Sequence, residues 1–484
     1  MRRLSFFGAG ALALGAAAFA ACHTDESTLP GGCAPGAWRC NGTVAELCTD
    51  GAFAASVDCA SSAQSCALDA LSGAAVCVSC ADGETRCTDG TLEHCSGASW
   101  QSSAVCADTG QVCRTTGASA ACVALGWTQL PVTIEDPVVN GSSLMVPVDA
   151  ISFAYEPASD VFVTAFDRDL TVPADTFFWR LDGASGVHAK QPLAGTTFAA
   201  SEGFCVGGED WCQLIGFDPL SSEWVVLGPS TGGMMRVGSS FASSIVAVTG
   251  THPPDSHVSR THRFAWPARK LFLYGSTGPS SFGDTVYAFD LDAASWSVAA
   301  SGLPQVDDNC LAHDPSTGLL YSVGGRVTTD GGNTTQTLAT YAVIDLAAGG
   351  QSTAPLPAQV GARQAMSCAF DPGRRVLYAF GGSVVNDPWD EAQNEYHNDL
   401  WALDVDQGTW TRLVADAASG TLGPPDAYGD HPFTGYPEGP NFGQNRGYLE
   451  YDASRDRLVV VGAVPIFTHE QIYFLDLGGV EQLL

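Results

Sequence analysis

The residues with the clearest chemistry in this chain are its 17 cysteines. Twelve of them form two consecutive sets of six, and the first five members of one set recur 47 positions later, Cys33 at Cys80 for example. We expect two tandem disulfide-linked modules, because segments this short cannot bury much apolar surface. Six cysteines allow many pairings, so the connectivity stays open. The twelve are Cys33, Cys40, Cys48, Cys59, Cys66, Cys77, Cys80, Cys87, Cys95, Cys106, Cys113 and Cys122.

The competing chemistry for these cysteines is metal binding or dithiol redox chemistry. Cys77 and Cys80 have the spacing of half a zinc site. They close one repeat and open the next, however, and the region has no second pair at that spacing. The disulfide interpretation is therefore favoured, and the modules are predicted to act as a rigid spacer, with a protein-binding role as the alternative.

Four further cysteines lie later in the chain. Cys205 and Cys212 are close enough to bridge locally, and Cys310 and Cys368 precede matching turns that they are predicted to link. Disulfides persist outside the cytosol, so this usage predicts an exported protein. The odd total leaves one cysteine for another purpose.

That cysteine is Cys22, which follows a typical secretory leader. A basic start at residues 1–3 precedes an apolar run over residues 4–21 that ends in small residues. The segment resembles a bacterial lipobox, in which the cysteine sulfur takes a diacylglycerol, although Phe19 stands where leucine is usual. The resemblance implies lipidation at Cys22. An ordinary cleaved signal peptide, with Cys22 as one more half-cystine, is the alternative.

The amino-acid composition limits the classes of partner that the chain can bind. The net charge is −31, from 52 acidic and 21 basic residues, and such a chain repels the phosphate backbone of nucleic acid. The 45% hydrophobic content supports a substantial core. We expect a monomer held at the membrane through its lipid and without a nucleic-acid partner.

After residue 127, two β-sheet patterns alternate. The first is an apolar strand, an acidic residue with proline, and a second apolar strand, as in the segments 153–163, 311–325 and 368–382, with weaker copies near residues 264 and 449. In the second pattern a strand ends at an aspartate that a tryptophan follows six positions later. Together the patterns predict four-stranded antiparallel units in which these aspartates end third strands. The pairs are Asp218 with Trp224, Asp290 with Trp296 and Asp404 with Trp410, and Asp182, Asp345 and Asp476 are equivalents without the tryptophan.

These residues resemble the kelch family. The doublets Gly324-Gly325 and Gly381-Gly382, followed by Tyr341 or Trp401 and then Trp410, carry the resemblance. It implies an all-β fold with a kelch-like β-propeller of six blades. Seven is the alternative count, because residues 225–263 leave room for another blade. The segment 127–130 resembles residues 410–413 and is expected to complete the last blade.

The predicted organisation is therefore a lipoprotein signal peptide at 1–21, a linker at 22–32, cysteine-rich repeats at 33–79 and 80–122, and a propeller at 127–484.

Long connections between strands two and three, and between strands four and one, are predicted to share one face. Rigid scaffolds usually carry ligand-binding residues on such loops. The longest connections are expected at residues 167–175, 225–261, 327–337, 383–398 and 415–445. The candidate ligand-binding residues are Trp389, Tyr396, His397, Tyr428, His431, Phe433 and Tyr436.

Metal sites are less well indicated. Residues 388–399 offer oxygen ligands suited to calcium but lack a spaced calcium-loop motif. His252, His257 and His262 lie in a proline-containing loop that fixes no geometry for a transition metal. No cofactor is predicted, and calcium remains an open alternative.

The function expected from these features is binding of a carbohydrate or a protein outside the cytoplasm, with the outer membrane as the predicted location. The alternative is a sugar-acting enzyme of the oxidase or mutarotase type, since some kelch propellers are enzymes. The copper oxidase type needs two tyrosines and two histidines, and no motif identifies those positions in this sequence.

Overall fold

The computed structural model describes residues 32–62, 64–68, 72–80, 82–117, 119–130, 133–134, 138–139, 142–143, 154–168, 176–195, 214–227, 233–251, 253, 262–265, 268–275, 283–329, 334–384, 395–415, 448–462 and 471–484. The chain divides into two compact units. The first comprises Met1–Arg86, Glu93–Ser103 and Gly117–Ser119, and the second comprises Cys87–Leu92, Ala104–Thr116 and Ala120–Leu484.

The cysteine-rich repeats share one plan. A three-stranded antiparallel sheet, a single 3-10 turn and a two-stranded hairpin follow each other in both repeats. The first repeat has β1 (Trp38–Asn41), β2 (Val44–Thr49), β3 (Ala52–Asp58), η1 (Cys59–Ser62), β4 (Ser65–Leu68) and β5 (Ala75–Val78). The second has β6 (Thr85–Thr88), β7 (Thr91–Ser96), β8 (Ser99–Val105), η2 (Cys106–Thr109), β9 (Gln111–Thr116) and β10 (Ser119–Ala124).

Disulfides link all twelve cysteines of the repeats, as predicted. In each repeat the first cysteine pairs with the third, the second with the fifth and the fourth with the sixth. Cys77 and Cys80 are bonded to different partners, which excludes the dithiol alternative. A bridge closing about 15 residues contributes roughly 3 kcal/mol. The pairs are Cys33–Cys48, Cys40–Cys66, Cys59–Cys77, Cys80–Cys95, Cys87–Cys113 and Cys106–Cys122.

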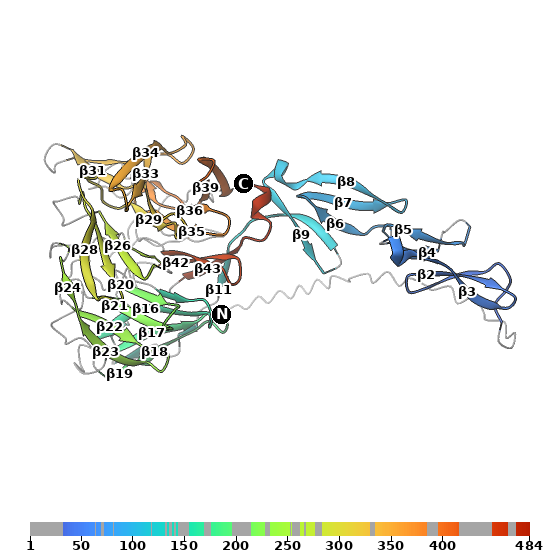
Figure 1. Ribbon diagram of the computed structural model, residues 1–484, viewed down its shortest axis with the longest axis horizontal. Coiled ribbons are helices and arrows are strands. Elements are labelled where there is room, and N and C mark those ends of the chain that lie inside the picture. The colour runs from blue at the N-terminus through green and yellow to red at the C-terminus, as the bar shows by residue number, and fades with distance from the viewer. Residues whose placement is uncertain are drawn as a thin grey trace, which may run out of the picture. The chain divides into compact units, whose positions relative to one another are not determined.

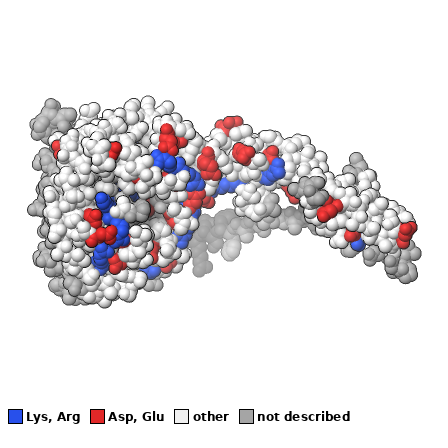
Figure 2. All heavy atoms as spheres, in the orientation of Figure 1, with Lys and Arg blue, Asp and Glu red and all other residues white. Residues whose placement is uncertain are grey.

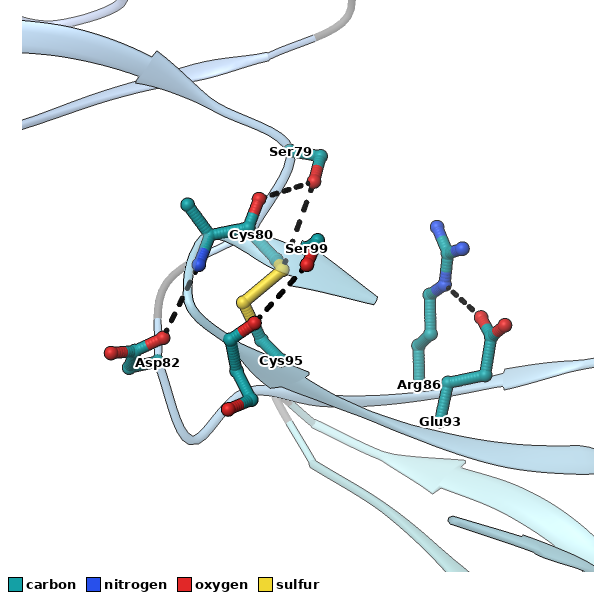
Figure 3. The surroundings of a disulfide bond; sticks show 9 residues. Ser79, Cys80, Asp82, Arg86, Glu93, Cys95 and Ser99 are labelled. Carbon is teal, nitrogen blue, oxygen red and sulfur yellow. Dashed lines mark hydrogen bonds and ion pairs between the residues drawn. A yellow bond between two sulfur atoms is a disulfide. The ribbon is translucent and has the colours of Figure 1, made fainter. Parts of the chain in front are cut away.

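Polar contacts fix the backbone around these bridges. Near Cys80–Cys95, the Ser79 hydroxyl donates a hydrogen bond to the Ala98 carbonyl at 2.7 Å. Arg86 pairs with Glu93 at 2.7 Å, as Figure 3 shows. The Arg86 guanidinium also lies 4.3 Å from the ring centroid of Trp100. The repeat is thus held by cross-links and surface contacts instead of a large core.

The second unit contains six four- or five-stranded sheets among its described residues. The first three sheets each carry a short parallel strand on the outer edge of a four-stranded antiparallel sheet. The first has β12 (Thr133–Ile134), β15 (Ala154–Glu156), β16 (Val161–Arg168), β17 (Thr176–Asp182) and β18 (Val187–Pro192). The second has β19 (Ala194–Gly195), β20 (Leu214–Asp218), β21 (Glu223–Leu227), β22 (Gly233–Val237) and β23 (Ala242–Ala247). The third has β24 (Thr249–Gly250), β25 (His262–Ala265), β26 (Lys270–Tyr274), β27 (Val286–Asp290) and β28 (Ser295–Ala300).

The last three sheets have four strands each, and Figure 1 shows their elements in yellow to red, except for β11 of the sixth sheet. The fourth has β29 (Cys310–His313), β30 (Leu319–Val323), β33 (Thr340–Asp345) and β34 (Gly350–Pro355). The fifth has β35 (Ser367–Asp371), β36 (Val376–Phe380), β39 (Leu400–Asp404) and β40 (Thr409–Val414). The sixth has β41 (Tyr448–Asp452), β42 (Arg457–Gly462), β43 (Gln471–Asp476) and β11 (Thr128–Leu130). A small hairpin is formed by β13 (Val138–Val139) and β14 (Ser142–Ser143).

Aspartates set the tight turns between these strands. The Asp404 carboxylate accepts hydrogen bonds from the backbone N–H groups of Asp406 and Gln407, both at 2.9 Å. Asp371 does the same for Gly373 and Arg374 in a turn between first and second strands. Such side-chain bonds mimic a backbone turn, which explains why acidic residues mark the hairpins.

The two kinds of turn look alike in sequence, and this produced one wrong prediction. Asp218 ends β20, the first strand of the second sheet, and does not end a third strand. Residues 225–261 were expected to form a long connection, but β21, β22 and β23 occupy much of this range. Asp218 and Trp224 have the third-strand spacing because the Asp218 turn uses the same side-chain bond, to Leu220 N–H at 3.0 Å.

Six hydrophobic clusters fill the spaces between successive sheets. The sixth cluster joins the first sheet, through Phe162 and Leu181, to the last sheet, through Val459 and Ile472. Burying each such side chain contributes about 1.5–3 kcal/mol. β11, which precedes the strands of the other five large sheets in sequence, pairs with β43 as predicted.

The observed class is all-β, as predicted. Within the described part of the chain, the helical segments are short 3-10 turns, and none is a candidate for spanning a membrane. Cys310 and Cys368 form the predicted disulfide between the fourth and fifth sheets. Cys205 and Cys212 lie outside the described residues.

Candidate functional site

Buried polar residues gather where the fourth and fifth sheets carry their connections between strands two and three. In an antiparallel four-stranded sheet, these connections and the chain segments that lead into each first strand share one edge. We call this the loop edge of the two sheets. Its buried polar residues are Asp308, Asn309, Ser322, Arg363, Gln364, Ser367, Ser383, Asn398 and Asp399.

Glycine doublets let the backbone turn sharply at this edge. Gly324 and Gly325 follow β30 with φ of +61° and +104°, and Gly381 and Gly382 follow β36 with φ of +67° and +93°. A Cβ on Gly324 would lie 2.3 Å from the Arg363 carbonyl oxygen. The doublet of the fourth sheet therefore packs directly against the segment that leads into the fifth, and only glycine fits there.

A buried ion pair crosses the loop edge of the fifth sheet. Arg363 lies before β35, and its guanidinium binds the Asp399 carboxylate, with Nη2 at 2.9 Å from Oδ2. Arg363 also donates to the Gly381 carbonyl at 3.1 Å, and the Trp401 indole N–H donates to Asp399 at 2.7 Å. Both charged side chains are 3% exposed. This network fixes the residues that flank the connection between β36 and β39.

The fourth sheet has an equivalent pair with the charges exchanged. Asp307 lies before β29 and accepts hydrogen bonds from Arg326, which follows β30, at 2.8 and 3.2 Å. Arg326 also contacts the buried Asp308 at 3.2 Å. In both sheets, an arginine–aspartate pair therefore anchors the connection between strands two and three.

Two hairpins project from these anchors. β31 (Arg326–Thr329) pairs with β32 (Thr334–Thr337), and β37 (Ser383–Val384) pairs with β38 (Glu395–Tyr396). His397 N–H donates to the Gly382 carbonyl at 2.9 Å. Of the candidate ligand-binding residues, Tyr396 and His397 are thus placed at the anchored base of the second hairpin.

The other candidates fall outside the described residues. They are Trp389, Tyr428, His431, Phe433 and Tyr436, together with His252 and His257 of the proposed histidine cluster and Cys22. The expected calcium loop at 388–399 is described only from residue 395. Within the described residues, no group of three or more His, Cys, Asp and Glu side chains is arranged to hold a metal ion.

The first strands of the sheets face one another, and one arginine crosses the space between them. Arg263 of β25 donates to the carbonyl oxygens of Cys368 at 3.2 Å and Leu449 at 3.3 Å, and pairs with Glu450 at 3.0 Å. These partners belong to the fifth and sixth sheets, whereas Arg263 belongs to the third. The space around Arg263, between the first strands, is therefore filled by the protein's own polar groups.

Burial and neighbouring polar or charged groups shift the pKa values of His313 and Asp314. Burial lowers the pKa of His313 to about 4, and the positive charges of Arg263 and Lys270 act in the same direction. Although burial opposes ionisation of Asp314, hydrogen bonds from Ser316 and Thr317 lower its pKa to about 2. At neutral pH, His313 is uncharged and packs 5.5 Å from the Phe272 ring, measured between centroids.

Basic and acidic side chains lie together on the face of the molecule that Figure 2 shows. Arg374 binds Asp371 and Asp456, and Arg375 binds Asp314 and Asp406. These pairs join the fifth sheet to its two neighbours. They serve the packing of the sheets against one another.

No protein-family model matches the chain, and no curated protein shows significant similarity to it.

Arg263 and Arg363 are the important residues that sequence reasoning missed, and Asp399 was predicted only as part of a calcium loop at 388–399, whereas it pairs with Arg363. None lies in a recognisable motif, and each partner is distant in sequence, such as Glu450 for Arg263. Asp399 stands two positions before Trp401, and a carboxylate so close to a buried indole is the one local signal that was available.

Proposed function

We propose that this chain is an exported, lipid-anchored binding protein, and that its six sheets are the blades of a kelch-like propeller. The cyclic sharing of hydrophobic clusters supports the propeller, since the last sheet packs on the first. The ligand is a carbohydrate or a protein, bound on the loop edge of the blades.

The observation that carries the proposal is the pair of anchored hairpins on the fourth and fifth sheets. Arg363–Asp399 and Arg326–Asp307 hold the ends of these hairpins. Keeping a charge pair buried is costly, and replacing it with apolar residues is often neutral or stabilising. A buried pair that positions two projecting loops therefore suits a binding surface that must be rigid before the ligand arrives.

The position of Arg263 favours a ligand-binding site on the surface and argues against a site deep between the sheets. The three bonds of Arg263 occupy the space that an axial ligand would need at that level. We therefore place the ligand above Arg263, where the hairpins project.

Export and anchoring rest on the cysteines. Seven disulfides join described residues, and such bonds persist in the periplasm or outside the cell. We propose that Cys22 carries the lipid, that the cysteine repeats form the stalk, and that the protein resides at the outer membrane. Metabolic labelling with palmitate tests this: label on the wild-type chain and none on Cys22→Ala supports the anchor, and equal labelling refutes it.

The binding proposal is tested with the purified chain on arrays of bacterial and host glycans and of cell-envelope proteins. Saturable binding without turnover of the ligand supports it and identifies the ligand class. Release of a chemically altered sugar would instead show an enzyme. Absence of saturable binding on both arrays would count against the proposal.

A further inference from the structure

The first and the last strands of the six sheets, β11 and β43, meet in the sixth sheet through a short contact. β11 and β43 pair at three positions, Thr128 with Phe474, Gln129 with Tyr473 and Leu130 with Ile472. β11 lies at the edge of this sheet, so β43 is its only neighbour there. A three-residue edge strand is a weak element, because few hydrogen bonds hold it.

The segment that follows β43 is bound by a residue that precedes β11. Arg114 of β9 donates from Nε to the Gly478 carbonyl at 2.9 Å and from Nη2 to the Asp476 carbonyl at 2.7 Å. Its Nη1 also lies 3.2 Å from the Asp476 carboxylate, which is 67% exposed. The two carbonyl bonds matter more than the ion pair, since exposed pairs contribute little.

A second contact imitates the pairing of two strands. The Gln482 side-chain amide accepts a hydrogen bond from Cys113 N–H at 2.7 Å and donates one to the Cys113 carbonyl at 3.3 Å. Both backbone groups of Cys113 are thereby satisfied by one side chain from the η5 turn (Val480–Gln482). This arrangement fixes the register between β9 and the C-terminal segment.

Apolar packing and disulfides complete the contact. Val112 is fully buried in the same hydrophobic cluster as Leu477 and Val480. The Cys87–Cys113 bridge holds the middle of β9, and Cys106–Cys122 links the turn before it to the strand after it. β9 therefore presents its docking residues from a cross-linked frame.

The first cysteine repeat lacks these docking residues. At the positions that match Val112, Cys113 and Arg114 it has Ser65, Cys66 and Ala67. Cys66 nevertheless forms the equivalent bridge, to Cys40, with the same sequence separation of 26 as Cys87–Cys113. The bridge thus belongs to the repeat in general, whereas the valine and the arginine are particular to the second copy.

We propose that Val112, Cys113 and Arg114 form a clamp that locks β11 against β43, so that the second cysteine repeat stabilises the closure of the binding domain. When β11 leaves β43, the clamp keeps the two segments close together and favours their return, because tethering raises their effective concentration. If the chain is anchored through its N-terminus, as proposed above, tension along the chain reaches the clamp before it reaches β11.

Hydrogen exchange of the full-length chain, followed by mass spectrometry, tests the clamp. We expect amides of 128–130 and 472–474 to exchange about ten-fold faster or more in Cys87→Ser/Cys113→Ser than in the wild type. The matched control is Cys40→Ser/Cys66→Ser, which removes a bridge of the same separation and should change these amides less than about two-fold. Equal rates in the two variants would overturn the proposal.

A second pair of variants leaves every disulfide in place. Arg114→Ala/Gln482→Ala should also accelerate exchange in 128–130, and Arg114→Lys should fall between it and the wild type, because lysine keeps the charge without the fork of donors. Wild-type exchange in Arg114→Ala/Gln482→Ala would refute the clamp. The measurement involves neither lipid nor ligand, so its failure is distinct from failure of the proposed function.

Discussion

Replacing Asp399 with asparagine should destabilise the larger unit strongly. The substitution keeps the size of the side chain but leaves the Arg363 guanidinium, 3% exposed, without a counter-charge. Removing one partner of a buried pair costs about 3–5 kcal/mol, because the remaining charge stays desolvated. The Trp401 N–H, which is 2.7 Å from the carboxylate, also loses its charged acceptor.

The assay is urea denaturation at neutral pH, followed by near-ultraviolet circular dichroism. Asp406→Asn is the control, since Asp406 pairs with Arg375 but is 59% exposed, and its loss should cost under about 1 kcal/mol. The double variant Arg363→Met/Asp399→Leu should lose less stability than Asp399→Asn alone, because no unpaired charge remains. An Asp399→Asn variant as stable as Asp406→Asn would refute this account of the loop edge.

Three further outcomes are expected. His313 has a folded pKa of about 4 against an ordinary 6.5, so its contribution is complete above pH 6.5 and is lost as the pH falls toward 4. Substituting His313 with glutamine should remove this pH dependence, which amounts to up to about 3 kcal/mol of unfolding free energy between pH 6.5 and 4. Denaturation measured at a series of pH values would show the difference. Gly324→Ala should lower the melting temperature more than Gly318→Ala, because both have positive φ but only the Gly324 Cβ would meet the Arg363 carbonyl. Arg263→Met should cost about 2–4 kcal/mol in urea denaturation, since Glu450 loses its partner, and an unchanged midpoint would show that the Arg263 bonds are unimportant.

Local chemistry explains what could be predicted from the sequence. The acidic turns and the glycine doublets, each readable within a few residues, and the repeated cysteine spacing yielded the β class and the disulfide-linked repeats. The likeness of residues 127–130 to 410–413 yielded the pairing of β11 with β43. The prediction that Asp218 ends a third strand was wrong because turns after first and third strands use the same side-chain hydrogen bond.

Long-range contacts explain what was missed. Arg263 and Glu450 are 187 positions apart, and Arg114 meets Asp476 across 362 positions. No periodicity or motif connects such pairs, since only the packing of the sheets in three dimensions brings them together. The disulfide pairing was equally beyond the sequence, which allowed many connectivities for each repeat.

The most direct test of the central claim is ligand binding by variants on opposite edges of the fifth sheet. Tyr396→Ala/His397→Ala alters the base of a hairpin on the loop edge, whereas Gln407→Ala alters an exposed turn at the other edge. Once the arrays have identified a ligand, titration calorimetry should show at least about a ten-fold loss of affinity, or roughly 1.4 kcal/mol, for the first variant and none for the second. Equal affinities for both variants and the wild type would contradict a binding site on the loop edge.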